Sequence, residues 1–253
     1  DRFIDPTVEN NAVWTLPTED QGATALVIGE GKLRQVPFAP LHEQKEIWDL
    51  QLVWTTNGLS GKARLSAHGQ SGTRVRRVIE PKTDRLRQSN ALLRTVLPDY
   101  SFQWIKTDGL RPAVDPVVLH GPIRTANLGS RQAQQTRQLS IGLNDWKLVH
   151  SWAPTAQRSA PLNIPHRYSR TLRYTLDVPR EYGVSAGDNL EISSPFGRFQ
   201  IRIRPLDRRV SVDVILERSA TQVSVQEYPE YRRWLSQIDG ALTRSIEVVR
   251  DAL

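Results

Sequence analysis

The sequence predicts a mainly β protein, built of antiparallel, β-sandwich-like regions that end in a C-terminal helix. Apolar and polar residues alternate over 47–55, 171–178, 199–204 and 210–214. This two-residue period is typical of strands with one buried face. Near the C-terminus the apolar residues instead recur three and four positions apart, which is the period of an amphipathic helix.

Residues 1–45 are expected to form the end of a preceding domain. A short apolar strand opens the chain and ends at Asp5, because a proline follows it. Residues 25–28 and 32–38 are expected to be the arms of a hairpin, whose turn at 29–31 contains two glycines. The chain would then leave this domain through a linker that has a proline at each end.

A β-rich domain with one helix is expected over residues 46–160. Its first strand, 47–55, is followed by a second strand at 63–67. Asn57 and Gly58 lie between the two, and both residue types tolerate the positive φ angles of tight hairpin turns. The two strands should therefore pair as a hairpin.

A turn and then a helix are expected after this hairpin. The glycines of 69–72 predict the turn, which would place Arg74 and Arg77 on the solvated face of a strand. Pro81 suits the first turn of a helix. Leucines that share one face extend this predicted helix to residue 97.

Further short strands are expected at 100–104, 114–123 and 139–143. Pro116 and Pro122 favour an edge position for the second of these strands, because proline donates no ladder hydrogen bond. Residues 126–138 are polar and rich in Gln and Arg, so they should form an exposed loop.

A second domain, an antiparallel sheet with a C-terminal helix, is expected over residues 161–253. The prolines of 144–166 predict an extended crossing segment that leads into it. A loop at 183–188 is expected to separate its strands, each of which has one apolar face that needs cover. The predicted helix at 229–249 is expected to supply that cover.

Composition limits the chemistry that this chain can perform by itself. The 253 residues include no Cys, which excludes disulfides, thiolate metal sites and a cysteine nucleophile. The formal charge of +7 favours an anionic partner, but the arginines are spread along strands, as on an ordinary solvated surface. No apolar run is long enough for a transmembrane segment. Because the sequence begins at Asp1 and contains no Met, we expect a fragment of a longer polypeptide.

Several stretches resemble, in their order along the chain, bacterial transglutaminase-like proteins of the papain type. They are Asp1-Arg-Phe-Ile-Asp5-Pro-Thr7, Leu16-Pro-Thr-Glu-Asp-Gln-Gly22, the meander 47–72 and Glu227-Tyr-Pro-Glu-Tyr-Arg-Arg-Trp-Leu235. In that family a domain of unknown function precedes the cysteine domain. The resemblance implies that this chain is the C-terminal part, from the triad Asp onward, and that residues 1–45 hold the closing strands of a transglutaminase-like α+β domain. It also implies a bacterial protein of the periplasm or the extracellular space.

The resemblance assigns Asp5 the third role in a Cys-His-Asp triad. In such a triad a thiolate attacks an acyl carbon, an imidazole transfers the proton, and the carboxylate orients the imidazole. The nucleophile would lie in the N-terminal catalytic portion of the same protein, either on one polypeptide with this chain or as a separate chain. This chain alone should therefore be inactive on peptide or protein amides. The residues alone favour the alternative, a turn-forming aspartate before a proline.

No cofactor or metal site is expected. The histidines are not at metal-ligand spacing, and no Gly-x-Ser-x-Gly motif is present. They are His42, His68, His120, His150 and His166.

Nucleic-acid binding is also not expected, although arginines gather between 198 and 209 near Phe196 and Phe199. Phe199 shares its face with apolar residues, which predicts a core position instead of a stacking platform. The alternative to an accessory part of an enzyme is a non-catalytic β-sandwich binding module of the cell envelope.

Overall fold

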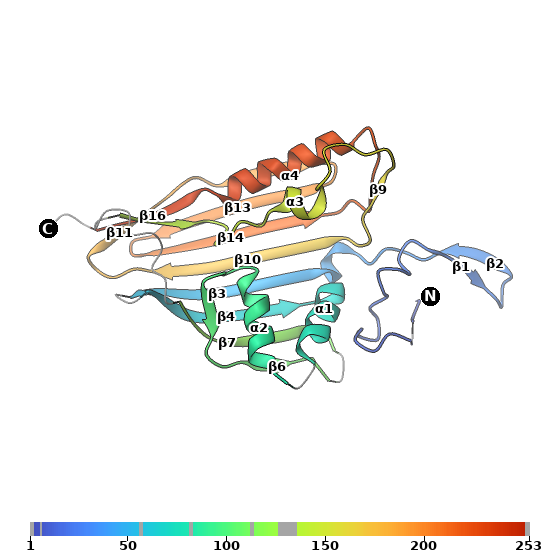
Figure 1. Cartoon of the computed structure of the whole chain (residues 1–253), viewed down its shortest axis with the longest axis horizontal. Coiled ribbons are helices and arrows are strands. Elements are labelled where there is room, and N and C mark those ends of the chain that lie inside the picture. The colour runs from blue at the N-terminus through green and yellow to red at the C-terminus, as the bar shows by residue number, and fades with distance from the viewer. Residues whose placement is uncertain are drawn as a thin grey trace.

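The computed structural model describes residues 3–5, 7–55, 58–80, 83–111, 114–125 and 136–250. Most of its regular structure is β, as predicted, and its centre is one nine-stranded sheet with helices on one face (Figure 1). Three predicted features lie wholly or largely outside the described residues: the hairpin turn at Asn57, the helix start at Pro81 and the loop at 126–138.

The large sheet joins strands from both halves of the chain. In spatial order it consists of β12 (Leu190–Ser194), β13 (Gly197–Leu206), β14 (Arg209–Arg218), β10 (Tyr168–Asp177), β3 (Lys45–Thr55), β4 (Gly58–Ala67), β7 (Val117–Thr125) and β5 (Tyr100–Phe102), with β6 (Lys106–Asp108) also on β7. Every pair is antiparallel except β10 and β3, which run parallel. The regions 46–160 and 161–253 therefore share one sheet, because β3 and β10 are hydrogen-bonded neighbours.

The strand register builds one continuous apolar face. Trp48 of β3 is opposite Leu65 of β4 on one side and opposite Leu172 of β10 on the other. Leu172 is in turn opposite Val214 of β14. All four side chains are buried, so the alternation in the sequence correctly predicted both the strands and their inner face.

Four helices lie over this face: α1 (Gly69–Ile79), α2 (Arg85–Arg94), α3 (Leu148–Trp152) and α4 (Tyr228–Leu242) (Figure 1). A short 3-10 turn, η1 (Leu41–Glu43), precedes β3. On α4, the Tyr231 and Trp234 rings contact Phe196, with ring centroids 5.2 and 6.4 Å apart. The prediction that the C-terminal helix covers the sheet is therefore confirmed. No described helix is both long and apolar enough to cross a membrane.

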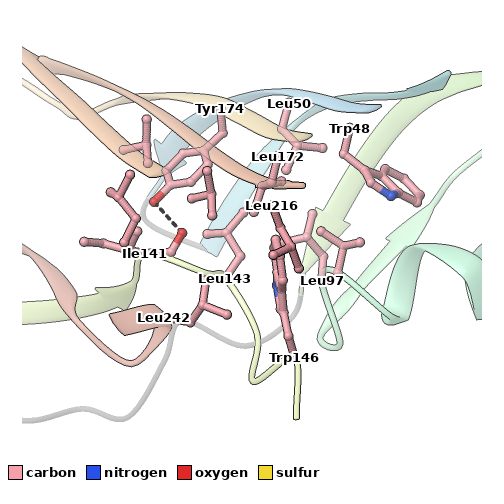
Figure 2. Close-up of a cluster of buried hydrophobic side chains, with 14 of the residues drawn as sticks. Trp48, Leu50, Leu97, Ile141, Leu143, Trp146, Leu172, Tyr174, Leu216 and Leu242 are labelled. Atoms are coloured by element: carbon pink, nitrogen blue, oxygen red, sulfur yellow. Dashed lines mark hydrogen bonds between the residues drawn. The ribbon is translucent and has the colours of Figure 1, made fainter. Parts of the chain in front are cut away.

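The segment 141–146 fills the core between α4 and the centre of the sheet (Figure 2). Ile141, Leu143 and Trp146 point toward β10 and β14, and the Tyr174 hydroxyl donates a hydrogen bond of 3.1 Å to the Ile141 carbonyl. Next along the chain, the amides of Leu148 and Val149 donate to the Asp239 carboxylate of α4. The extended crossing predicted here thus contains a short helix whose first N–H groups are capped from α4.

The turn predicted at 69–72 is wrong, because these residues form the first turn of α1. Val75, Arg76 and Ile79 are buried at helical spacing, which places Arg74 and Arg77 on a helix and not on a strand. The glycine at 72 serves close packing: a Cβ there would lie 2.9 Å from an Asp115 oxygen.

The C-terminal helix is shorter than predicted, because residues 245–250 form a strand. This strand, β16 (Ser245–Arg250), lies between β11 (Tyr182–Ala186) and β8 (Thr136–Ser140). Ile246 and Val248 are buried two positions apart, so the apolar pattern changes from helical to strand period after α4. The loop predicted at 183–188 is correspondingly wrong, since β11 occupies most of it.

The edge position predicted for β7 is wrong, because β7 lies between β4 on one side and β5 and β6 on the other. Pro122 is tolerated because its backbone faces the break between β5 and β6. There its carbonyl accepts a hydrogen bond of 3.0 Å from the Gln103 amide, and no ladder donor is required.

Candidate functional site

The N-terminal segment forms a small unit of its own beside the sheet. Its hairpin, β1 (Thr24–Val27) with β2 (Lys32–Gln35), is confirmed and extends away from the large sheet (Figure 1). The short strand predicted up to Asp5 is wrong, since Phe3 to Asp5 have no regular structure. Another two-stranded pair, β9 (Leu162–Asn163) with β15 (Gln222–Val223), lies elsewhere along the chain.

Asp5 closes a turn on its own chain. Its Oδ1 accepts hydrogen bonds from the Thr7 amide at 2.8 Å and the Thr7 hydroxyl at 2.6 Å. These bonds hold the pKa of the Asp5 carboxyl below its ordinary value. The pKa of nearby Asp20 is raised by burial and by the charges of Asp5 and Glu19. Asp5 is therefore an ionised carboxylate at neutral pH, in the turn geometry that its sequence context allowed.

Helix α1 fixes the connection between Asp5 and the hairpin. The Thr73 hydroxyl donates to the Asn11 side chain at 2.7 Å, and Gln70 donates to the Leu16 carbonyl. The Arg76 guanidinium donates to the Asn10 carbonyl at 3.1 Å. The segment is thus held at several points, while the hairpin beyond it receives little cover.

Three large apolar side chains on the hairpin and its turn are exposed to solvent. The exposed fractions are 61 % for Leu26, 89 % for Ile28 and 70 % for Leu33. An isolated two-stranded hairpin is marginally stable in water, and gathered exposed apolar side chains mark interaction surfaces. We call Leu26, Ile28 and Leu33 the hairpin patch.

The histidines are not brought together with Asp5. Within the described ranges, no three His, Asp or Glu side chains gather closely enough to hold a metal ion. Burial lowers the pKa of His68, and burial together with Arg218 and Arg74 lowers the pKa of His166 to about 4. Both imidazoles are therefore neutral at pH 7.

Three arginines near β13 lie on the sheet face opposite the helices and are paired with acids, while Arg202 donates to the Gln200 side chain. Ion pairs join Arg198 to Glu217 at 3.0 Å, Arg204 to Asp213 at 2.6 Å and Arg209 to Asp177 at 2.5 Å. Phe199 is fully buried, as predicted. The arginines here thus have no exposed Phe199 ring beside them on which a base could stack.

A groove of about 630 Å³ crosses the same outer face over β3, β4, β7 and β10. Trp104 stands at its edge with half of its surface exposed, and Lys106 lies 6.0 Å from the centre of its ring. Lys62 and Arg64 of β4 also line the groove, and neither forms an ion pair with a described residue. The groove combines free cations with an exposed indole.

Comparisons with known proteins extend over parts of the chain. Residues 140–248 match DUF3858. That family model is described as a Domain of Unknown Function with solved-structure structure, and its match runs from the end of β8 into β16. The region includes β10 to β14, α3 and α4, but neither β3 and β4 nor the segment that contains Asp5.

One solved structure matches part of this chain. It is a crystal structure described as a "putative protease" from Parabacteroides distasonis, with 18 % identity and a TM-score of 0.39. The match covers 48 % of this chain and 25 % of that chain. No curated protein matches this sequence. The resemblance to transglutaminase-like proteins therefore stays a prediction.

Proposed function

We propose that this chain is an accessory portion of a bacterial transglutaminase-like cysteine enzyme that acts on peptide or protein amides, and that it is inactive alone. Its N-terminal segment would dock onto a catalytic portion located, like this chain, in the periplasm or outside the cell. The observation that carries this proposal is the hairpin patch: Leu26, Ile28 and Leu33 are exposed on a hairpin that extends away from the sheet. Such a hairpin gains most by packing against a partner sheet.

The carboxylate of Asp5 suits the role of orienting an imidazole. Thr7 occupies Oδ1 with two hydrogen bonds, so an incoming N–H group would share the remaining acceptor capacity of the carboxylate only with the neighbouring Asp20 carboxyl. The lowered pKa of Asp5 keeps this acceptor charged, so it would stabilise an imidazolium formed during proton transfer. The Thr7 turn would in this way fix the direction of the carboxylate.

The test compares the chain alone with the chain joined to the polypeptide encoded upstream of it. We expect a Cys at a helix start and a His ahead of Asp5 in that polypeptide, and amide hydrolysis or acyl transfer only in the joined protein. Asp5→Asn should lower the rate about a hundredfold or more, whereas the exposed Glu9→Gln should change it little. Activity in the isolated chain, or an upstream sequence that lacks the Cys and His, would refute the proposal.

A second measurement tests the docking itself. Hydrogen exchange of residues 24–35 should be fast in the isolated chain and slow in the joined protein, because burial protects the β1–β2 amides. Leu26→Ser should weaken the docking of the hairpin onto the catalytic portion and so reduce the protection of residues 24–35 in the joined protein. The matched variant Leu206→Ser changes an exposed residue of the large sheet and should not have this effect. A monodisperse isolated chain whose hairpin amides are already protected would contradict docking.

The groove on the outer sheet face favours a second candidate, a non-catalytic module that binds polypeptides of the cell envelope. Lys62, Arg64 and Trp104 would contact acidic and apolar side chains of an extended partner. This candidate requires binding by the isolated chain. Trp104→Ala should then abolish the binding of acidic peptides, and unchanged binding would exclude the groove.

A further inference from the structure

A second cavity, of about 650 Å³, lies on the helical side of the molecule. Its wall is formed by α1, α3, β10 and β14, so it is separated from the outer groove by the sheet itself. Its lining is rich in guanidinium groups and aromatic rings. The cationic and aromatic lining residues are Arg74, Arg77, Arg170, Arg218, Trp146, Trp152, His166 and Tyr168.

Arg218 is the buried cation of this cavity that lacks a carboxylate. Its exposed fraction is 6 %, and no described acid forms an ion pair with it. One Nη donates a hydrogen bond of 3.3 Å to the His166 carbonyl, while the buried Nε has no hydrogen-bond partner. The guanidinium carbon lies 4.1 Å from the centre of the Trp152 ring. A buried cation that stacks on an aromatic ring but has no carboxylate beside it lowers the stability of the folded protein.

Arg170 is a buried guanidinium of the same cavity whose charge is neutralised by an acid, although its Nε also has no hydrogen-bond partner. It pairs with Glu46 at 2.9 Å and lies 5.1 Å from the Trp146 ring. The Glu46 carboxylate also forms an ion pair with Arg74 at 2.6 Å and accepts a hydrogen bond of 3.1 Å from the Trp48 indole. Glu46 is therefore fully occupied by other donors and cannot also neutralise Arg218.

The remaining charges leave the cavity electropositive. Arg77 lines it from α1, is exposed, and has no ion-pair partner among the described residues. Asp145 is the one acid among the described lining residues, and one of its oxygens already accepts from the Lys147 amide. The buried Nδ1 of His166 has no hydrogen-bond partner either. Positive charge and aromatic rings thus line one space.

We infer that this cavity binds the oxyanion group of a ligand, which is a carboxylate or a phosphate. Buried Arg218 binds the oxyanion inside the cavity, and exposed Arg77 attracts it at the entrance. The planar fork of a guanidinium matches the paired oxygens of both groups. The Trp152 ring, which already stacks on Arg218, restrains that fork in one orientation. An apolar part of the ligand would contact Trp146 and Leu148 on the same wall. This site is independent of Asp5 and of the proposed docking of the hairpin.

Calorimetric titration with three small probes tests the site. Phenyl phosphate and N-acetylphenylalanine carry the two oxyanions, and N-acetylphenylalaninamide presents the same ring without a charge. We expect one or both anions to bind and the amide to bind at least tenfold more weakly. The preferred anion then identifies the ligand class. Absence of binding by both anions at millimolar concentration would overturn the inference, and so would equal binding of the amide.

Variants locate the binding. Arg218→Gln should weaken the preferred anion at least tenfold, and Arg209→Gln, on the outer face, should leave it unchanged. Because Arg218→Gln could alter the fold, exposed Arg77→Gln serves as a second variant, with an expected weakening of severalfold. In nitrogen-15 NMR of the wild type, the Arg218 Nε–H and Trp152 indole signals should move on titration. Anion binding that neither arginine variant weakens would refute the site.

Discussion

Arg76 of α1 and Asp115 form an ion pair with 2.6 Å between Nη2 and Oδ1, and the Arg76 side chain is only 1 % exposed. The same guanidinium donates to the carbonyls of Asn10, Gly109 and Val114. Asp115 also accepts from the Gly69 amide at the start of α1, at 2.7 Å. One buried arginine thus connects the N-terminal segment, α1 and the connection between β6 and β7.

Arg76→Met should therefore destabilise the protein by about 3–5 kcal/mol, because it leaves Asp115 and three carbonyls without their donor. Urea unfolding measures this change in free energy. Hydrogen exchange should also show faster exchange at residues 10–16. The neighbouring exposed Arg77→Met is the control and should cost less than about 0.5 kcal/mol. Equal stability of the two variants would contradict the role assigned to Arg76.

Glu46→Gln should have a similarly large effect. Burial opposes the ionisation of Glu46, but Arg170 and Arg74 outweigh it, and the pKa of the carboxyl lies below its ordinary value. Removing the negative charge leaves Arg170 buried without compensation, so we expect a loss of about 3–5 kcal/mol.

The control for Glu46 is Glu217→Gln, which removes the partly exposed ion pair with Arg198 and should cost about 0–1 kcal/mol. Both free energies are measured by urea unfolding at pH 7. A Glu46→Gln variant as stable as Glu217→Gln would show that the buried network contributes little.

The strands were predictable because alternation depends only on which face of a strand is buried. Their neighbours were not, since β3 and β10 have similar apolar patterns and nothing in either sequence specifies that they pair in parallel. Helix α1 was missed because its two glycines are also typical of turns. Gly72 is required by the close approach of Asp115, and Gly69 has a positive φ angle that favours glycine. The period change after α4 was missed because Ile246 fits both patterns.

The candidate sites also differ in whether local sequence predicts them or only the fold brings their residues together. The turn at Asp5 could be predicted from its local context, because its hydrogen bonds to Thr7 are local interactions. The arginine cavity could not, because Arg74, Arg170 and Arg218 are far apart in the sequence and converge only through the sheet order. An arginine on a strand has no sequence signal that separates a solvated side chain from a buried one.

Stability should fall as the pH is lowered from about 6.5 toward 4, because of His166. Burial, Arg218 and Arg74 lower the pKa of this imidazole from 6.5 to about 4 in the folded protein. Between these values the unfolded chain binds the proton and the folded protein does not, so the free energy of unfolding decreases with decreasing pH. The slope for one proton approaches about 1.4 kcal/mol per pH unit, reduced here because the ring is only partly buried.

The measurement is urea unfolding of the wild type and His166→Gln between pH 7 and pH 5. Other groups titrate in both proteins, so the difference between the two curves isolates His166. The wild type should lose more stability than the variant over this range. Parallel curves would show that His166 is protonated as easily in the folded protein as in the unfolded chain.

Two glycine-to-alanine substitutions should change stability in opposite directions. In α4, a Cβ at Gly240 would have no atom within 4 Å, so Gly240→Ala should stabilise by about 0.5–1 kcal/mol through its higher helix propensity.

In β4, a Cβ at Gly61 would lie 1.8 Å from the Gln51 carbonyl oxygen of β3. Gly61→Ala must therefore separate the β3–β4 pair locally and should cost about 3 kcal/mol or more. Thermal unfolding of the two variants beside the wild type checks both signs. A neutral Gly61→Ala would mean that β3 and β4 can separate without cost, and a destabilising Gly240→Ala would mean that α4 packs on a surface at that position.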